Sequence, residues 1–543
     1  MELMYADVSR AYFYAKAVRA VYVKLPEEDQ EEGDAGKCGR LKMSMYGTRD
    51  AALNWASEYS ETLLAAGFER GKANPCLFWN PKTDVSIFVH GDDFVAVGSP
   101  KFLKETRETL ENKYKLKVET LGNKDGQKTE VKILNKIVRH TDRGIELEAD
   151  PRHAEIVIKE LGLEDAKATR VPGTKAPKGE DKKKGACEDE TEDEGPEEEE
   201  DLSPEEATKY RALAARLNYL AVDRVDIQYS VKEAARAMSC PKEGHWTLLR
   251  RIGKYLRGTP RLVMKFPWQS PQSVMTTYTD SDWAGCLKTA RSTSGGVITM
   301  GGHMIRSWSR QQKVVALSSA EAELYAMVAA SAECLGLIAY ARDLGMTMSG
   351  EIYADSSAAL GIAQRCGIGK VRHLRTQSLW VQEVRLTKRL TYKKVLGTKN
   401  PADILTKYVP AELLKRHLAT LGTAAVGGRA DAAPELCMMM MEVVKEWEEP
   451  LNNSGPKDKQ VRFATKVRLR SIPSANRGRR CDKVARKELQ GTKRKEAVRS
   501  EASQEEAKTE RKTDGFESGR RSNPILEKPR RADEFDHHEG DCE

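Results

Sequence analysis

Four acidic residues in the second half of the chain lie where predicted strands end or predicted helices begin. They are Asp280, Glu323, Asp355 and Asp403. Magnesium prefers oxygen ligands, and phosphoryl-transfer sites of the two-metal type gather carboxylates around ions about 3.5–4 Å apart. Such ions stabilise the attacking and the leaving oxygen of a displacement at phosphorus. The four residues are therefore candidate catalytic residues and candidate ligands for Mg²⁺ or Mn²⁺.

One of these positions, and one acid close to another, also have an ordinary structural interpretation. Asp403 follows an Asn-Pro pair that signals a helix start, so it could be a first-turn acid stabilised by the helix dipole. In an earlier helix, Ser318 is a candidate N-cap with Glu321 three residues later as its partner. Assigning Glu321 to this cap leaves Glu323 as the better candidate for a metal ligand.

A second group of acids lies near the N-terminus. Asp7 ends the apolar stretch 3–6, and Asp92 and Asp93 occupy the tip of a predicted hairpin between two apolar strands. Paired acids at a tight turn are usually turn formers. The flanking strands, however, are apolar enough to be buried, which is unusual for a solvated turn. Metal binding by Asp7, Asp92 and Asp93 is therefore the alternative.

The elements that must position these acids predict an α/β fold with helices and strands mixed along the chain. Residues 85–97 have the pattern of strand, turn and strand. Helices are predicted at 101–115, 205–220 and 227–238. A Ser203–Glu206 capping box begins the second of them. Further strands are predicted at 273–279, 296–307 and 351–354. The clearest helix follows Ser318, with apolar residues at helical spacing as far as Ile338.

Composition excludes several classes of protein. The ten cysteines contain no C-x-x-C pair, which argues against a zinc ribbon or a disulfide scaffold and fits a reducing compartment. No run approaches about 18 apolar residues, so we expect no membrane span and no membrane partner. The first ten residues lack the basic-then-apolar pattern of a signal peptide. We therefore expect an intracellular protein, in a cytoplasmic particle or the nucleus.

Composition also divides the 543 residues into segments. Residues 180–201 hold thirteen acids and three lysines and no aromatic residue, which predicts an acidic disordered linker over 174–204. A charged, largely disordered tail is predicted over 422–543. The segments expected to fold are 1–173, 205–268 and 269–421.

The net charge of +8 is unevenly distributed. Residues 202–420 contain 32 Lys and Arg against 17 Asp and Glu, a net charge of +15 that suits a polyanionic partner. Four basic residues at helical spacing are candidate contacts to a nucleic-acid backbone. They are Arg250, Arg251, Lys254 and Arg257. The alternative is a solvated helix face.

Three sequence blocks in the first 93 residues follow a familiar order. They are Asp7-Val8-Ser9-Arg10-Ala11-Tyr12, the block from Arg40 to Trp55, and His90-Gly91-Asp92-Asp93. Together they resemble the reverse transcriptase of copia-type LTR retrotransposon Pol polyproteins. The resemblance implies that 1–173 is a truncated polymerase palm and thumb with Asp7, Asp92 and Asp93 as its metal-binding acids. It also implies that Tyr12 is the steric gate against ribonucleotides.

The second half resembles the connection and RNase H regions of the same family. The matching blocks are Tyr210 to Thr259, Tyr278 to Gly285, Ser292 to Gly296, Ala316 to Glu323, Tyr353 to Ala358 and Pro401 to Lys407. The resemblance implies connection helices over 205–268 and an RNase H-like domain over 269–421. Asp280, Glu323, Asp355 and Asp403 would then hydrolyse the RNA strand of an RNA–DNA hybrid through a metal-activated water. The implied partners are that hybrid, an RNA template with a DNA primer, and the remainder of a Pol polyprotein.

The sequence also departs from the family pattern. The family's fingers region precedes motif A, where this chain starts, so we expect an impaired polymerase. Asp50 replaces a Gln near the nucleotide phosphates, and His90-Gly91 replaces Tyr-Val. His373, in a changed K-H-I-D block, could lie near the scissile phosphate or could simply begin a helix. The expected activity is RNase H, with polymerase activity doubtful. The competing hypothesis is a non-catalytic relic that only binds nucleic acid.

Overall fold

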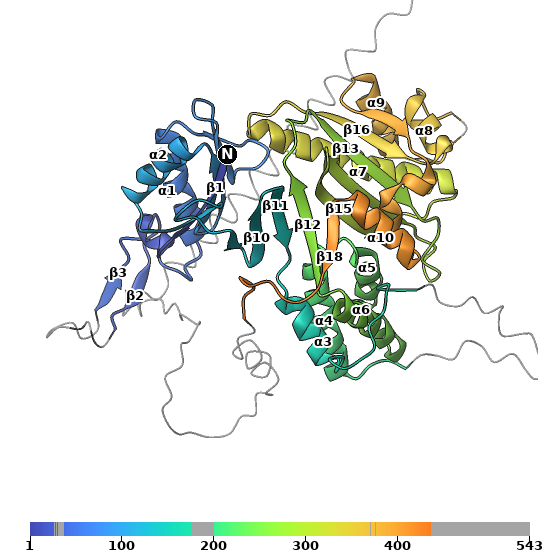
Figure 1. Cartoon of the computed structure of the whole chain (residues 1–543), viewed down its shortest axis with the longest axis horizontal. Helices are drawn as coiled ribbons and strands as arrows, with labels where there is room; N and C mark the ends of the chain where they lie inside the picture. The colour runs from blue at the N-terminus through green and yellow to red at the C-terminus, as the bar shows by residue number, and fades with distance from the viewer. Residues whose placement is uncertain are drawn as a thin grey trace, which may run out of the picture. The chain divides into compact units, whose positions relative to one another are not determined.

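The computed structural model describes residues 1–26, 28, 30, 37–174, 200–369, 371–374 and 376–435. Most of the acidic run predicted as a linker and most of the predicted tail therefore lie outside the described residues. Figure 1 shows helices and strands intermixed along the chain, so the predicted α/β class is confirmed.

The N-terminal part is built on a six-stranded antiparallel sheet. Its order is β4-β5-β6-β7-β1-β8. The strands are β1 (Glu2–Val8), β4 (Glu69–Arg70), β5 (Leu77–Asn80), β6 (Val85–His90), β7 (Asp93–Gly98) and β8 (Leu116–Leu121). The helices are α1 (Ala51–Ala65) and α2 (Pro100–Glu111), and a short ribbon pairs β2 (Tyr22–Lys24) with β3 (Cys38–Arg40). The predicted hairpin over 85–97 is confirmed as the β6–β7 pair.

A second, five-stranded sheet joins residues from distant parts of the chain. Its order is β18-β12-β11-β10-β9, with every pair antiparallel. The strands are β9 (Glu130–Ile133), β10 (Lys136–Thr141), β11 (Gly144–Glu148), β12 (Arg261–Pro267) and β18 (Thr423–Val426). Strand β18 lies inside the segment predicted as a tail, and the sheet takes strands from three of the predicted segments. The segment boundaries remain a prediction.

Helices in the middle of the chain share one hydrophobic core with this sheet. They are α3 (Arg152–Glu160), α4 (Pro204–Ala221), α5 (Gln228–Arg236) and α6 (Trp246–Gly258). The capping box predicted for α4 is confirmed, because Ser203 Oγ accepts from Glu206 N and the Glu206 carboxylate accepts from Ser203 N. An ion pair between Arg224 and Asp226 is fully buried within this core region, with 2.7 Å between Nη2 and Oδ2.

The third sheet carries the acids of the second half. Its order is β15-β14-β13-β16-β17, with β13, β16 and β17 parallel and the other pairs antiparallel. The strands are β13 (Val274–Ser281), β14 (Thr293–Met300), β15 (His303–Gln311), β16 (Ser349–Ala354) and β17 (Thr391–Lys394). The single strand predicted at 296–307 is wrong: a turn at Gly301, whose φ is +60°, splits it into β14 and β15.

Helix α7 (Ser319–Asp343) packs across β13, β14 and β16. Ser318 caps it as predicted, since its hydroxyl accepts from Glu321 N. Within the described residues, only this helix is long and apolar enough to cross a membrane by length and composition. Its buried side chains, which include Leu324, Met327 and Ile338, pack in the core of this sheet. The remaining helices are α8 (Ser357–Gln364), α9 (Trp380–Leu386) and α10 (Ala411–Thr420).

Candidate active site

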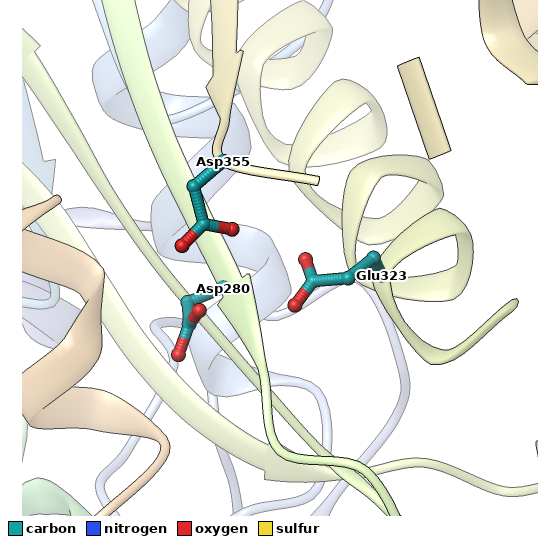
Figure 2. Close-up of side chains that lie close together, drawn as sticks. All are labelled: Asp280, Glu323 and Asp355. Atoms are coloured by element: carbon teal, nitrogen blue, oxygen red, sulfur yellow. The ribbon is translucent and has the colours of Figure 1, made fainter. Parts of the chain in front are cut away.

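Three of the predicted carboxylates meet at one edge of the third sheet. Asp280 lies near the end of β13, Asp355 directly follows β16, and Glu323 projects from the first turns of α7 (Figure 2). Because β13 and β16 are parallel neighbours, their carboxyl ends reach the same edge, which α7 crosses. One oxygen from each carboxylate lies within 4.8 Å of the other two. We refer to Asp280, Glu323 and Asp355 as the acidic triad.

Burial and mutual repulsion make Glu323 and Asp355 costly to ionise. Asp280 is 2% exposed and Glu323 is 8% exposed. Burial, followed by the charges of Asp280 and Asp355, raises the pKa of Glu323 to about 9. Burial and the Asp280 charge also raise the pKa of Asp355. The protein therefore holds three carboxyl groups that a nearby cation would favour in the ionised form.

The hydrogen bonds of Glu323 fit a metal ligand. Its Oε1 accepts from Ser281 N at 3.1 Å, which fixes the direction of the carboxyl group. Its Oε2 is buried, and no hydrogen-bond donor reaches it within the described part of the chain. A buried carboxylate oxygen without a partner is energetically unfavourable, and a divalent cation would satisfy it. The acidic triad therefore fits an oxygen-ligated divalent metal ion.

Asp403 lies next to the triad, in the first turn of a helix whose start the Asn-Pro pair predicted. It stands in a short 3-10 helix, Pro401–Leu405, which is capped by Asn400. Burial and the Asp280 charge raise the pKa of Asp403 to about 6. The ammonium of Lys407 lies 3.1 Å from Asp403 Oδ1 and 3.5 Å from Asp280 Oδ2. Asp403 is thus coupled to the triad by charge and through Lys407.

Glu321 and His373 form a separate pair. His373 Nε2 lies 2.9 Å from Glu321 Oε2, and the other Glu321 oxygen accepts from the Tyr325 hydroxyl. The Glu321 carboxylate also accepts from Leu317 N. Burial alone would raise the pKa of Glu321, but these hydrogen bonds outweigh it and the pKa is lowered. Glu321 N therefore donates to the Ser318 cap as expected, but the Glu321 carboxylate accepts from Leu317 N instead of Ser318 N, and the half-exposed His373 contacts it.

The N-terminal acids are neighbours across two strands. Asp7 on β1 pairs with Asp93 on β7, and Val8 N donates to the Asp92 carbonyl at 2.9 Å. Asp93 accepts from the Tyr5 hydroxyl at 2.5 Å, and Lys117 Nζ lies 3.5 Å from Asp7 Oδ2. Among the described residues, the compact three-carboxylate grouping occurs only at the acidic triad. Asp7, Asp92 and Asp93 remain candidate ligands at the sheet edge.

Trp55 supports the hairpin that carries Asp92 and Asp93. Its indole Nε1 donates to the Gly91 carbonyl at 2.8 Å, and the side chain is 1% exposed. Gly91 has φ +65°, a left-handed conformation that glycine adopts without strain. Apolar periodicity does not predict this contact, because the contact joins a helix to a loop tip 36 residues away in the sequence.

Replacing Trp55 with Phe should lower the free energy of unfolding by about 1–3 kcal/mol, because the core loses part of the buried indole together with its hydrogen bond to the Gly91 carbonyl. Urea unfolding of the whole chain measures the change. The matched control is Trp79→Phe, which removes a hydrogen bond to Asp84 at an exposed position of the same sheet. Equal losses for the two variants would contradict the proposed support of the hairpin.

The residues predicted to contact nucleotide or nucleic acid differ in whether their side chains are already bonded within the protein. The Tyr12 ring stacks on that of Tyr46, with 4.2 Å between ring centroids. On α6, Arg257 donates to the backbone carbonyls of Glu164 and Ala166, both at 2.5 Å. Its guanidinium is therefore engaged in holding a loop. Three other basic residues of that stripe stay candidates for backbone contact: Arg250, Arg251 and Lys254.

Two residues of this site were missed from sequence. Lys407 lies between Asp280 and Asp403, and the Thr406 hydroxyl donates to Asp280 Oδ2. The sequence contains part of the evidence for Lys407, because this residue stands four positions after Asp403, about one helical turn away. Burial and the acids act in opposite directions on Lys407: burial would lower its pKa, but the charges of Asp280 and Asp403 raise it.

Residues 2–174 match the family described as reverse transcriptase (RNA-dependent DNA polymerase). The retrovirus-related Pol polyprotein from transposon TNT 1-94 of Nicotiana tabacum is 26% identical over 419 residues, which cover 76% of this chain and 30% of the relative. This chain spans 23–30% of the length of three such relatives.

Two solved structures are also similar. A foamy viral protease-reverse transcriptase in complex with an RNA/DNA hybrid is 12% identical, with a TM-score of 0.39, over 80% of this chain and 46% of that one. LC11-RNase H1 in complex with an RNA/DNA hybrid is 21% identical, with a TM-score of 0.20, over 26% of this chain and 99% of that one. Residues 2–174 therefore match the reverse transcriptase family, and the chain resembles the Pol polyproteins of copia-type retrotransposons.

Proposed function

We propose that this chain hydrolyses the RNA strand of RNA–DNA hybrids, using Mg²⁺ or Mn²⁺ held by Asp280, Glu323 and Asp355, with Asp403 beside them. The observation that carries the proposal is the convergence of three buried or half-buried carboxylates, each with an oxygen within 4.8 Å of the others. Such a cluster is unfavourable without a cation, and phosphoryl-transfer enzymes of the two-metal type require one. The resemblance of the chain to Pol polyproteins adds support.

The residues of the site have distinct tasks in this proposal. Bound divalent ions would supply an activated water and neutralise charge that develops on the phosphate oxygens. Asp280 is central, because its charge acts on the pKa of Glu323, Asp355 and Asp403 alike. Glu323 must lose its proton to act as a ligand, and Ser281 N keeps its carboxyl group aimed at the other two acids.

The charge distribution supports a nucleic acid as the substrate. The region from 202 to 420 has a net charge of +15 and contains the whole acidic site. A duplex with an RNA strand is recognised through groove shape, backbone phosphates and 2′-hydroxyl groups. Arg250, Arg251 and Lys254 on α6 are the proposed contacts to the backbone.

RNA-directed DNA polymerisation is a second candidate function. The match of residues 2–174 to the reverse transcriptase family favours it, as does the pairing of Asp7 with Asp93 across β1 and β7. An RNA template with a DNA primer would be the substrate, and Tyr12 would select deoxyribonucleotides. Primer extension that is lost in the double variant Asp92→Asn, Asp93→Asn would support this function.

The proposed nuclease is tested with four labelled duplexes of one sequence: RNA–DNA with the label on either strand, RNA–RNA and DNA–DNA. With Mg²⁺, the chain should cut only the RNA strand of the hybrid, and EDTA should stop the reaction. Hybrid binding without cleavage under Mg²⁺ and Mn²⁺ would overturn the proposal in favour of a non-catalytic relic.

A further inference from the structure

The ammonium of Lys407 stands between two carboxylates of the proposed metal site. Its Nζ lies 3.5 Å from Asp280 Oδ2 and 3.1 Å from Asp403 Oδ1. The same Asp280 oxygen accepts a hydrogen bond from the Thr406 hydroxyl. Lys407 follows the Asp403 helix directly, so its stem is anchored beside the site while 41% of its side chain stays exposed.

This position coincides with the one that a second ion would take. Magnesium binds carboxylate oxygens at about 2.0–2.1 Å, so an ion shared by Asp280 and Asp403 must lie between their oxygens. An ammonium within 3.5 Å of both oxygens fills that space and carries charge of the same sign as the ion. The two cations therefore exclude one another.

The other side of Asp280 is free of this conflict. There Glu323 and Asp355 complete the acidic triad, and among the described residues neither of their side chains forms an ion pair with a basic residue. Glu323 Oε2 also has no donor in the described part of the chain. An ion held by the triad has two ligands, Glu323 and Asp355, that form no ion pair within the described residues, whereas both ligands of an ion held by Asp280 and Asp403 contact the Lys407 ammonium.

We propose that Lys407 is a positioning residue that makes the two metal positions unequal, by competing with the ion bound between Asp280 and Asp403. This inference rests on the proposed function, since it concerns the ions of that site. The half-exposed Lys407 side chain can move into solvent when the second ion arrives. Breaking its contacts with Asp280 and Asp403 costs free energy, and this cost lowers the net affinity for that ion. The ion at the triad binds first.

Removal of the ammonium should therefore tighten one site and leave the other unchanged. Like charges a few ångströms apart interact by several times the thermal energy, even when partly screened. Lys407→Met should accordingly raise the affinity of the weaker site about fivefold or more. Lys407→Arg keeps the charge and should leave both affinities within about twofold of the unchanged protein.

The test is a Mn²⁺ titration of the full chain followed by calorimetry and by electron paramagnetic resonance, which reports binding without turnover. Lys415→Met, which removes an exposed lysine from α10, is the matched control. We expect two unequal sites, a tightened weak site in Lys407→Met, and no change in Lys415→Met. Should Lys407→Met not fold, judged by circular dichroism, Lys407→Gln replaces it.

Unchanged affinities in the Lys407 variant would overturn the inference. So would a loss of hybrid cleavage with both affinities unchanged, since Lys407 would then contact substrate. Either result leaves the proposed function standing. Failure of the proposed function looks different: no Mn²⁺ binding that depends on Asp280, in any variant.

Discussion

Asp280→Asn is expected to lower hybrid cleavage by a factor on the order of 10³ or more while raising thermal stability in EDTA. Cleavage falls because Asp280 is the carboxylate shared by the triad and the Asp403–Lys407 pair, and an electrostatic group at the centre of a site contributes most. Stability rises because the Asp280 charge opposes ionisation of Glu323, Asp355 and Asp403. An amide of the same shape removes that repulsion.

The measurements are initial cleavage rates with Mg²⁺ and melting temperatures in EDTA at pH 7. Glu351→Gln is the control, since Glu351 lies on β16 four residues before Asp355 but pairs with Lys393 at the surface. It should leave the cleavage rate within about twofold. A variant Asp280→Asn that loses both activity and stability would indicate a structural role for Asp280 and contradict the account.

The pH dependence of stability should carry the signature of Glu323. Its pKa rises from 4.5 in the unfolded chain to about 9 in the folded one. Between these two values, Glu323 is protonated in the folded state and ionised in the unfolded state. The stability that is present below about pH 4.5 is therefore lost as the pH rises toward 9. Asp403, with a pKa of about 6, adds a loss between about pH 4 and 6. In EDTA, the melting temperature should therefore fall across this range.

Two changes should flatten that slope. Glu323→Gln removes the titrating group, and saturating Mg²⁺ replaces the proton as the stabilising cation. Glu321→Gln is the matched control two residues earlier on α7. The pKa of Glu321 is lowered, so its contribution is present above about pH 4.5 and lost as the pH falls. If the melting temperature of Glu323→Gln in EDTA still falls as steeply with rising pH as that of the unchanged protein, ionisation of Glu323 does not cause the fall. That result would contradict the account of the triad.

Local signals predicted the parts of the site that lie on regular elements. The Ser318 cap predicted where α7 starts and distinguished Glu321 from Glu323. In the structure, the two carboxylates accept hydrogen bonds from different partners. Strand ends located Asp280 and Asp355, because parallel neighbours bring their carboxyl ends together. These inferences depend on periodicity within one element, which the sequence contains.

Contacts between distant segments could not be predicted in the same way. Strand β18 pairs with β12 across about 160 residues, and its four residues carry no pattern that distinguishes an edge strand from a loop. The turn at Gly301 was missed because the strands on both sides of it have similar composition. The Trp55–Gly91 bond and the contact of Lys407 with Asp280 depend on tertiary packing alone.

The measurement that tests the central claim most directly compares hybrid cleavage by Glu323→Gln and Glu321→Gln, purified in parallel and assayed with Mg²⁺. The two variants make the same chemical change two residues apart on one helix, but only Glu323 faces Asp280 and Asp355 (Figure 2). We predict that Glu323→Gln abolishes cleavage of the RNA strand and that Glu321→Gln retains most of it. Equal activity in the two variants, or loss of activity in Glu321→Gln alone, would contradict the assignment of the acidic triad as the catalytic metal site.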